Sequence, residues 1–445
     1  MVDEQRLLNP ENSPQQGSLR MSEAQEPPKV TPQSLVSEKL LRAALKADKG
    51  DDAEMVSWEV KDFTNKGDNY ACVVTSGIVR YRQGDDKERE VTYVAKCNPL
   101  RNMAAFESFT KIVFMKEAQF YQKIVPLINT ELEATGQEPL RLPTWYVNHL
   151  VEGKEIIVLK DMRPDGFKMF DRLKGMDVVH VSLVLQELAR LHATSTIVQA
   201  KMSEPMEVTY DFLQKDYGDY SGAAYERFFE TVFASNMETV AKMAEKVGGY
   251  DTVVKWLNSN AAQGLDMVLG CLKKSPPFDV ICHGDCWNNN ILFKYDEAGK
   301  PIDVRLIDLQ ICRKASPATD LNYLMYSSLN GSVRRENLQA FLKTYHDAYA
   351  EVLSEFGKPM PFTLEELKKE YHNQNLFGLL MSLMVIPFVV AESNEVIDFE
   401  EMTGDMDADV KRMQDKMIEQ AETNPLLRPR LLATFDEMLE YGVIS

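Results

Sequence analysis

The stretch ICHGDCWNNNILF, residues 281–293, carries a histidine, an acid and three asparagines between two apolar ends. Asp285 stands five residues before Asn290, and a further acid, Asp308, lies eighteen residues beyond that amide in an apolar, strand-like run. Each of these residues taken alone is typical of a helix cap or a turn, because Asp and Asn often bond to nearby backbone amides. The complete string with its downstream acid is much less typical of a cap, and it indicates a site that uses carboxylate and amide oxygens together.

Phosphoryl transfer is the chemistry that this spacing fits. The reaction needs a carboxylate that orients the attacking hydroxyl, and hard oxygen ligands that hold Mg²⁺ against the nucleotide phosphates. Asp285 can meet the first need, and Asn290 with Asp308 can meet the second. Catalytic loops of kinases use the same spacing from Asp to Asn and then a metal-binding Asp. The residues therefore predict ATP and Mg²⁺ as cofactors.

Composition excludes several other classes of function. A chain of 445 residues exceeds the size of a single hydrophobic core, so at least two lobes are expected. The net charge of −18 disfavours nucleic acid and anionic membrane surfaces as partners. Cys282 and Cys286 lack a second pair of metal ligands at finger spacing, so structural zinc is not expected. No basic-then-apolar leader opens the chain, and the longest apolar run, residues 376–391, is shorter than a bilayer span, so we expect a cytoplasmic protein with no membrane span.

Hydrophobic patterning divides the chain into a tail and two lobes. Residues 1–33 are rich in Gln, Pro, Glu and Ser, which predicts a disordered tail. Residues 34–162 are expected to form an ATP-binding lobe on a small antiparallel sheet, and residues 163–445 a catalytic and substrate-binding lobe that is mainly helical. The expected strands are residues 57–63, 70–82, 90–98, 144–150 and 154–162, and the expected helices of the first lobe lie within residues 34–47 and from 109 to a stop near Pro126.

Residues upstream of the loop fit the phosphate side of a nucleotide site. Gly67 and Asn69 lie between two expected strands, where a tight turn can cover phosphates, although one glycine is ordinarily just a turn. Lys96 ends an expected strand and is a candidate for the α- and β-phosphates, and Glu117 on the next helix is placed to pair with it. An exposed lysine and a solvated acid remain the alternatives.

The segment VLKDM, residues 158–162, is similar to the hinge that connects the two lobes of a kinase and binds adenine through its backbone. Leu159 and Asp161 are therefore candidate nucleotide-binding residues. Asp161 can equally cap the turn that follows it.

Five segments resemble the ecdysteroid kinase-like proteins, an insect-expanded group within the aminoglycoside phosphotransferase and choline kinase assemblage. These segments are HGDCWNNNILF, IDLQICRKASPATDLNYLMYSS, LARLHATS, VLKDM and GDNYACVV, and the resemblance keeps a consistent order over about residues 55–395. It implies an α+β, protein-kinase-like fold with two lobes, and ATP-dependent phosphorylation of a small-molecule hydroxyl.

The resemblance assigns roles to individual residues. Asp285 becomes the catalytic base, and Asn290 and Asp308 become the magnesium ligands. Lys96 becomes the phosphate-binding lysine and Glu117 its partner.

Three further residues receive an interpretation from the same comparison. Asp320 is similar to a family acid that braces the catalytic loop, so it is kept apart from the residues that meet substrate. His192 is interpreted as a packed core histidine, because it lies on an apolar helix face. Lys160 departs from the family pattern, since related sequences often have Glu there, and any side-chain contact to adenine at this position is in doubt.

The resulting prediction is a small-molecule kinase whose acceptor is a largely apolar alcohol: an ecdysteroid, another sterol, or a plant phenol or glycoside. The reasoning is that the expected pocket segments, including the run with Met381 and Met384, are rich in Leu, Met, Phe and Val and show no compact acidic cluster. The same residues fit a buried core equally well. The alternatives are a catalytically silent nucleotide-binding pseudokinase and a metal-dependent hydrolase. No protein partner is inferred, and hormone inactivation and detoxification both remain open as roles.

Overall fold

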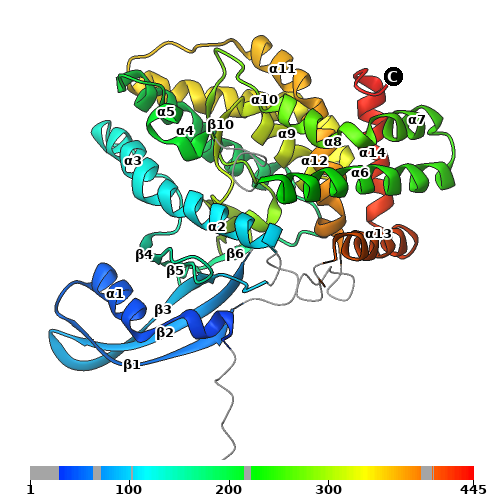
Figure 1. Ribbon diagram of the computed structural model, residues 1–445. Coiled ribbons are helices and arrows are strands. Elements are labelled where there is room, and N and C mark those ends of the chain that lie inside the picture. Colours follow the sequence, from blue (N-terminus) through cyan, green and yellow to red (C-terminus); the bar gives the residue numbers. More distant parts are fainter. Residues whose placement is uncertain (1–29, 64–71, 102–103, 215–221, 392–402, 404) are drawn as a thin grey trace, which may run out of the picture. The chain divides into compact units, whose positions relative to one another are not determined.

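The computed structural model describes residues 30–63, 72–101, 104–214, 222–391, 403 and 405–445. The chain separates into residues 1–30 and residues 31–445, and every element below belongs to the second unit. Within that unit the fold is α+β, with an antiparallel sheet lobe followed by a larger helical lobe (Figure 1). Gly67 and Asn69, which the sequence predicts at the phosphates, lie outside the described residues.

The first lobe is built on a five-stranded antiparallel sheet with the strand order β1-β2-β3-β5-β4. Register pairs Val94 with Leu159 and Lys96 with Ile157, so Lys96 shares one face of the sheet with Val94. The strands confirm the five predicted from β-branched and aromatic runs, and they are β1 (Ala53–Asp62), β2 (Val73–Gln83), β3 (Asp85–Cys97), β4 (Trp145–His149) and β5 (Ile156–Lys160).

Helix α1 (Glu38–Lys49) packs on this sheet and follows the short 3₁₀ turn η1 (Pro32–Leu35). The helix begins at Ser37, whose side chain accepts a hydrogen bond from the backbone N–H of Leu40. Gly77 of β2 allows the close approach, because a Cβ at that position would lie 2.6 Å from a methyl group of Leu41. The helix predicted within residues 34–47 is thereby confirmed.

Helix α2 (Ala104–Gln119) does not lead to a stop near Pro126, and that part of the prediction was wrong. A π-helical turn, η2 (Phe120–Ile124), joins α2 to α3 (Val125–Ala134), so helical backbone continues for two further turns. In the π-helical turn, the N–H of Val125 donates to the carbonyl of Phe120. Pro126 then stands in the first turn of α3, where the missing N–H and the fixed φ of proline are tolerated.

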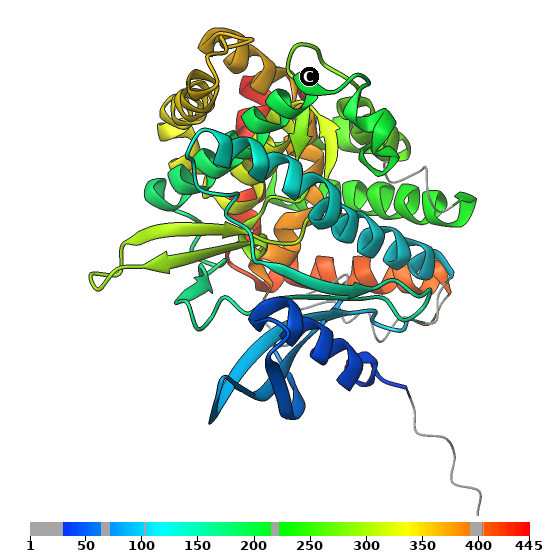
Figure 2. The same cartoon turned by 90° about the vertical axis from the view of Figure 1, so that its left-hand side faces the viewer.

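The second lobe is mainly helical, as predicted, and it also contains five short strands. The strands form a three-stranded sheet in the order β6-β8-β9 and a separate pair of β10 with β7. Figure 2 shows the β8–β9 hairpin extending away from the helices. The strands are β6 (Phe167–Met169), β7 (Val280–Cys282), β8 (Ile291–Tyr295), β9 (Pro301–Leu306) and β10 (Arg313–Ala315).

Helices make up most of the second lobe (Figures 1 and 2). They are α4 (Val178–Lys201), α5 (Met206–Thr209), α6 (Gly222–Val247), α7 (Asp251–Asn260), α8 (Gly264–Cys271), α9 (Pro317–Ser328), α10 (Gly331–Glu355), α11 (Leu364–Asn373), α12 (Asn375–Val390), α13 (Met406–Thr423) and α14 (Leu427–Glu440). Three 3₁₀ turns accompany them: η3 (Asp211–Leu213), η4 (Ala261–Gln263) and η5 (Asn288–Asn290).

The apolar run of residues 376–391 forms most of α12, a buried helix of the second lobe. Pro387 lies inside the last turn, and side chains from other elements bind the carbonyls there: Arg172 donates to Val389 at 2.5 Å, and Gln420 donates to Pro387 at 2.8 Å. Over the part of the chain that the structure describes, no single helix is long and apolar enough to cross a membrane. The bent pair of α11 and α12, taken together, does have the length and composition of a membrane span.

One hydrophobic cluster is shared by elements of both lobes. It contains Phe114 of α2, Ile128 of α3 and Leu191 of α4, together with Ile281 and Leu309, which lie close in sequence to Asp285 and Asp308. All five side chains are buried. This packing fixes α2, and with it Glu117, relative to the segments that carry the predicted catalytic residues.

Candidate active site

The loop that carries Asp285 leaves strand β7 through a turn that only glycine can make. Gly284 has φ of +85°, and a Cβ on it would lie 2.2 Å from the carbonyl oxygen of Ile311. His283 fixes the same turn, because its Nε2 bonds to the Ile307 carbonyl at 2.9 Å and its Nδ1 accepts from the backbone N–H of Asp285 at 3.2 Å. The histidine before Gly-Asp therefore holds the loop.

Asp320 of α9 holds this loop by hydrogen bonds to its backbone. One carboxylate oxygen accepts the N–H of His283 at 2.7 Å and the other accepts the N–H of Gly284 at 2.9 Å. His192 of α4 lies 3.1 Å from the same carboxylate through Nε2, while its Nδ1 contacts the hydroxyl of Tyr345 at 2.9 Å. Burial alone would raise the pKa of Asp320, but the hydrogen bonds from His192 and from the Gly284 backbone hold it below its usual value. The predicted brace and the predicted core histidine thus contact each other.

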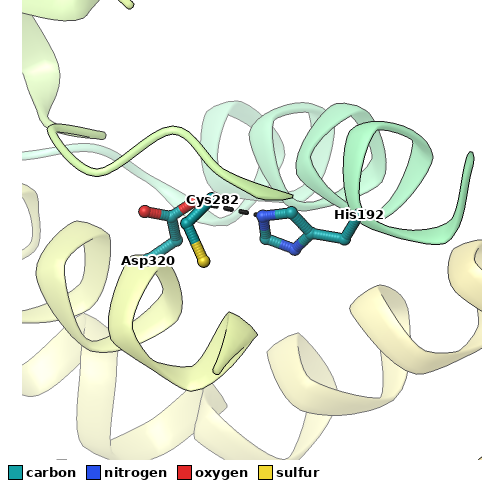
Figure 3. A group of neighbouring side chains, drawn as sticks. All are labelled: His192, Cys282 and Asp320. Carbon is teal, nitrogen blue, oxygen red and sulfur yellow. Dashed lines mark hydrogen bonds and ion pairs between the residues drawn. The ribbon is translucent and has the colours of Figure 1, made fainter. Parts of the chain in front are cut away.

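Cys282 completes a group with His192 and Asp320 in which the possible ligand atoms lie within 4.8 Å of one another (Figure 3). The possible ligand atoms of this group already bond to other parts of the fold. Asp320 accepts two backbone N–H groups, and the thiol of Cys282 lies 3.4 Å from the carbonyl of Ser316. Burial, followed by the charge of Asp320, raises the pKa of Cys282 well above its usual value, which keeps the thiol protonated. These contacts describe a structural brace for the loop.

Asp285 is held by two side-chain donors, one on each carboxylate oxygen. The hydroxyl of Tyr323 donates to Oδ1 at 2.6 Å, and Nδ2 of Asn290 donates to Oδ2 at 2.9 Å and to the Asp285 carbonyl at 2.9 Å. Because the Asn290 nitrogen is used in this way, its amide oxygen is the atom left for a ligand in the adjoining cavity. Burial and the charge of Asp308 raise the pKa of Asp285, whereas the bonds from Tyr323 and Asn290 oppose that rise.

Lys96 joins the sheet lobe to Asp308 across the two lobes. Its ammonium donates to Asp308 Oδ1 at 2.6 Å and also to Glu117 of α2. Burial alone would lower the pKa of Lys96, but the carboxylates of Asp308 and Glu117 hold it well above its usual value. Asp308 has φ of +68°, a conformation that non-glycine residues rarely adopt and that often marks a functional position.

A cavity of about 300 Å³ lies between the sheet and the loop. Lys96, Asn290 and Asp308 line its polar part, so three of the predicted site residues meet in one place. Its apolar lining includes Val74, Val94, Leu159, Leu292 and Ile307. An apolar cavity with a few convergent polar groups at one end is the usual form of a small-ligand site.

The two predicted hinge residues, Leu159 and Asp161, both border this cavity but have different contacts. Leu159 lines it directly and is buried. Asp161 also borders it, but its carboxylate is bound by the guanidinium of Arg163, with Nη2 at 2.8 Å from Oδ2. Arg163 in turn donates to the hydroxyl of Ser76 at 3.0 Å and lies 3.9 Å above the ring of Phe63. Asp161 therefore positions an arginine at the cavity mouth.

Lys160, which departs from the family pattern, forms an ion pair with Asp165 at 2.7 Å. Sequence reasoning missed two residues of the site, Tyr323 and Arg163. Tyr323 follows Asp320 by three residues, about one helical turn, and that spacing was the available signal.

The two methionines of α12 have different surroundings. Met381 is buried in the main core of the second lobe. Met384 borders a small hollow of about 20 Å³ whose other lining residues are Asn236, Pro387, Phe388, Ala391, Met413, Lys416, Met417 and Gln420. The core interpretation therefore holds for Met381, and the pocket interpretation is restricted to Met384.

Comparison with known proteins gives a family and several distant structural likenesses. The Plasmodium vivax ethanolamine kinase is 11% identical, with 88% of this chain and 91% of that chain covered and a TM-score of 0.41. The choline kinase LicA from Streptococcus pneumoniae is 14% identical over 86% and 99% of the two chains, with a TM-score of 0.36. An aminoglycoside phosphotransferase from Streptomyces rimosus is 15% identical over 78% and 99%, with a TM-score of 0.29.

No curated protein matches the chain in sequence. The family model described as the ecdysteroid kinase-like family matches residues 66–358, which is well over half of the chain and spans every site residue from Gly67 to Asp320. The chain therefore belongs to the ecdysteroid kinase-like family and has a protein-kinase-like fold of two lobes.

Proposed function

We propose that the protein is an ATP- and Mg²⁺-dependent kinase that phosphorylates a hydroxyl of a small molecule. One observation carries the proposal: Lys96 and Asp308, 212 residues apart in sequence, meet at 2.6 Å on the wall of one cavity that Asn290 also lines. A phosphate-binding cation, a carboxylate and an amide oxygen at the end of an apolar cavity are the parts that phosphoryl transfer requires.

Each residue has a distinct part in this reaction. Asp285 accepts the proton of the acceptor hydroxyl while the hydroxyl oxygen bonds to the γ-phosphorus and the bond from that phosphorus to the ADP oxygen breaks. Lys96, held by Glu117, neutralises phosphate charge. Asp308 and the amide oxygen of Asn290 are hard oxygen donors, which fits Mg²⁺, and the metal would supply charge neutralisation at the phosphates.

The two lobes divide these tasks. We assign nucleotide binding to residues 34–162, with Leu159 against the base and Asp161 acting through Arg163 at the cavity mouth. We assign catalysis and acceptor binding to residues 163–445, and a cytoplasmic location to the protein. Gly67 and Asn69 are proposed to cover the phosphates, as their place between two strands predicts.

The proposed acceptor is a largely apolar alcohol such as an ecdysteroid, another sterol, or a plant phenol or glycoside. The apolar helix α12, which carries Met384, supports this choice, because it is rich in Leu, Met, Phe and Val and none of its residues is charged. Adaptable methionine side chains suit acceptors of several apolar shapes.

Two substitutions separate catalysis from binding. Asp285→Asn should lower turnover by about 10²-fold or more with Mg-ATP affinity retained, because the proton acceptor is lost and the phosphate contacts remain. Asp308→Ala should abolish the dependence of ATP binding on Mg²⁺, because the metal loses its carboxylate ligand. Steady-state kinetics measure turnover, and calorimetric titration with ATP, with and without Mg²⁺, measures binding; Asp266→Asn on the exposed face of α8 is the control. Wild-type turnover in Asp285→Asn, or an unchanged Mg²⁺ dependence in Asp308→Ala, would reject the corresponding role.

A further inference from the structure

We propose that Tyr323 is a positioning residue of the phosphotransfer site, which fixes the orientation of the Asp285 carboxylate by a hydrogen bond from its phenol. This inference rests on the proposed function, because it needs Asp285 to be the base. Its structural basis is the direct contact of 2.6 Å between the Tyr323 hydroxyl and Asp285 Oδ1.

A single donor would leave the carboxylate free to turn about its χ2 bond. Here Tyr323 holds one oxygen and Asn290 Nδ2 holds the other at 2.9 Å, so both oxygens of Asp285 have fixed partners. Each carboxylate oxygen has two acceptor sites, so an acceptor hydroxyl can still bond to a base that is held in this way. The phenol therefore orients the carboxylate without occupying its full capacity.

Helix α9 contacts the loop that carries Asp285 in two ways, through the loop backbone and through the Asp285 side chain. Asp320, in the first turn, holds the loop backbone through the N–H groups of His283 and Gly284. Tyr323, one turn later on the same helix, holds the Asp285 side chain. Because both contacts come from one helix, the Asp285 side chain keeps a fixed position relative to the backbone of its loop.

The ring of Tyr323 is fixed independently of its hydroxyl. The residue is only 4% exposed, and its ring lies 6.4 Å, centroid to centroid, from Phe377 of the apolar helix α12. Tyr323→Phe therefore keeps the packed ring and removes the bond to Asp285. We expect kcat to fall by about 10- to 100-fold, which is the usual cost of a misoriented catalytic group, with the KM for ATP unchanged.

Tyr326 provides a matched control on the same helix. Its ring is buried and lies 4.3 Å from the guanidinium of Arg334. Tyr326→Phe makes the same chemical change in the same helix and should leave kcat within about twofold of wild type, as expected for a hydroxyl that does not touch the base.

The experiment measures phosphate release from Mg-ATP with water as the acceptor, for wild type, Tyr323→Phe, Tyr326→Phe and Asp285→Asn. Rates are expressed per ATP-binding site titrated by calorimetry, so misfolded protein does not count. A low kcat in Tyr323→Phe with wild-type KM for ATP, beside a normal Tyr326→Phe, supports the proposal. Equal rates in Tyr323→Phe and wild type, while Asp285→Asn is impaired, overturn the role of Tyr323 alone. Wild-type rates in Asp285→Asn overturn the assignment of the base itself.

Discussion

At the scale of single residues, two backbone conformations shape the candidate active site. Gly284, in the loop that carries Asp285, and Asp308, on the cavity wall, both have positive φ, +85° and +68°. Glycine adopts this region freely, whereas Asp pays a modest cost in strain. At Asp308 the cost is offset by the ion pair with Lys96, which needs the carboxylate turned toward the sheet lobe.

Gly284→Ala should lower the melting temperature and reduce turnover by about 10²-fold, because the new Cβ would lie 2.2 Å from the Ile311 carbonyl and displace Asp285. Gly299→Ala is the control, since Gly299 has φ of +78° in the β8–β9 turn and no atom within 4 Å of a Cβ. That variant should lose about 1 kcal/mol of stability from the backbone term and keep its activity. Steady-state kinetics and thermal unfolding test both variants, and full activity in Gly284→Ala would contradict the geometry of the loop.

The chemistry-bearing residues could be predicted from the sequence, whereas their positioning partners could not. Asp285, Asn290 and Asp308 stand at a spacing with a direct chemical reason, so the sequence indicates them without a structure. Tyr323 and Arg163 act through tertiary contacts, the first to a loop 38 residues away and the second to Ser76 of the sheet. The spacing of Tyr323 from Asp320 places the two residues on neighbouring positions of one helix, but it does not say which group the tyrosine contacts, because that is set by the packing of the helix.

At the scale of elements, the C-terminal helix is tied to the lobe by a buried ion pair. Arg334 of α10 and Glu437 of α14 are each 1% exposed, and the guanidinium meets the carboxylate at 2.6 Å. The ring of Tyr326 in α9 lies 4.3 Å from the same guanidinium. The pair therefore connects α10, α14 and the helix that carries Tyr323.

Glu437→Ala should lower the free energy of unfolding by about 3 to 5 kcal/mol, because it leaves the Arg334 charge buried without its partner. Glu440→Ala is the matched control, since Glu440 pairs with Arg335 on the same two helices but both side chains are exposed, 57% and 44%. That variant should cost less than about 1 kcal/mol. Urea unfolding monitors both, and equal effects of the two substitutions would show that burial does not determine the strength of this connection.

The existence of the elements was predicted better than their boundaries. The strands of the sheet lobe are runs of β-branched and aromatic residues and were all identified, but β1 and β3 begin at Ala53 and Asp85, earlier than the predicted residues 57 and 90. The predicted helix ended near Pro126, whereas helical backbone continues to Ala134. The π-helical turn that precedes this proline has no sequence signature of its own, so the continuation was not predicted. Within the second lobe, which was expected to be mainly helical, the 3₁₀ turn η4 separates α7 from α8.

At the scale of the folded unit, function depends on the meeting of residues from both lobes. The cluster shared by α2, α3 and α4 holds Glu117 in place, Glu117 holds Lys96, and Lys96 meets Asp308. The sequence predicted this convergence from family resemblance and from the requirements of phosphoryl transfer. It did not give the acceptor pocket, because the shape of a pocket follows from side-chain packing and not from any motif.

Transfer of the γ-phosphoryl group to an alcohol tests the central claim most directly. The protein is incubated with Mg²⁺ and ATP labelled at the γ-phosphate, in the presence of ecdysteroids, other sterols, plant phenols, glucosides, choline or an aminoglycoside. We predict a labelled phosphate ester of an apolar alcohol, formed in equal amount to ADP, dependent on Mg²⁺ and absent with Asp285→Asn. Saturable binding of Mg-ATP without a labelled ester from any of these alcohols would contradict the account and would identify a nucleotide-binding protein that does not transfer phosphate.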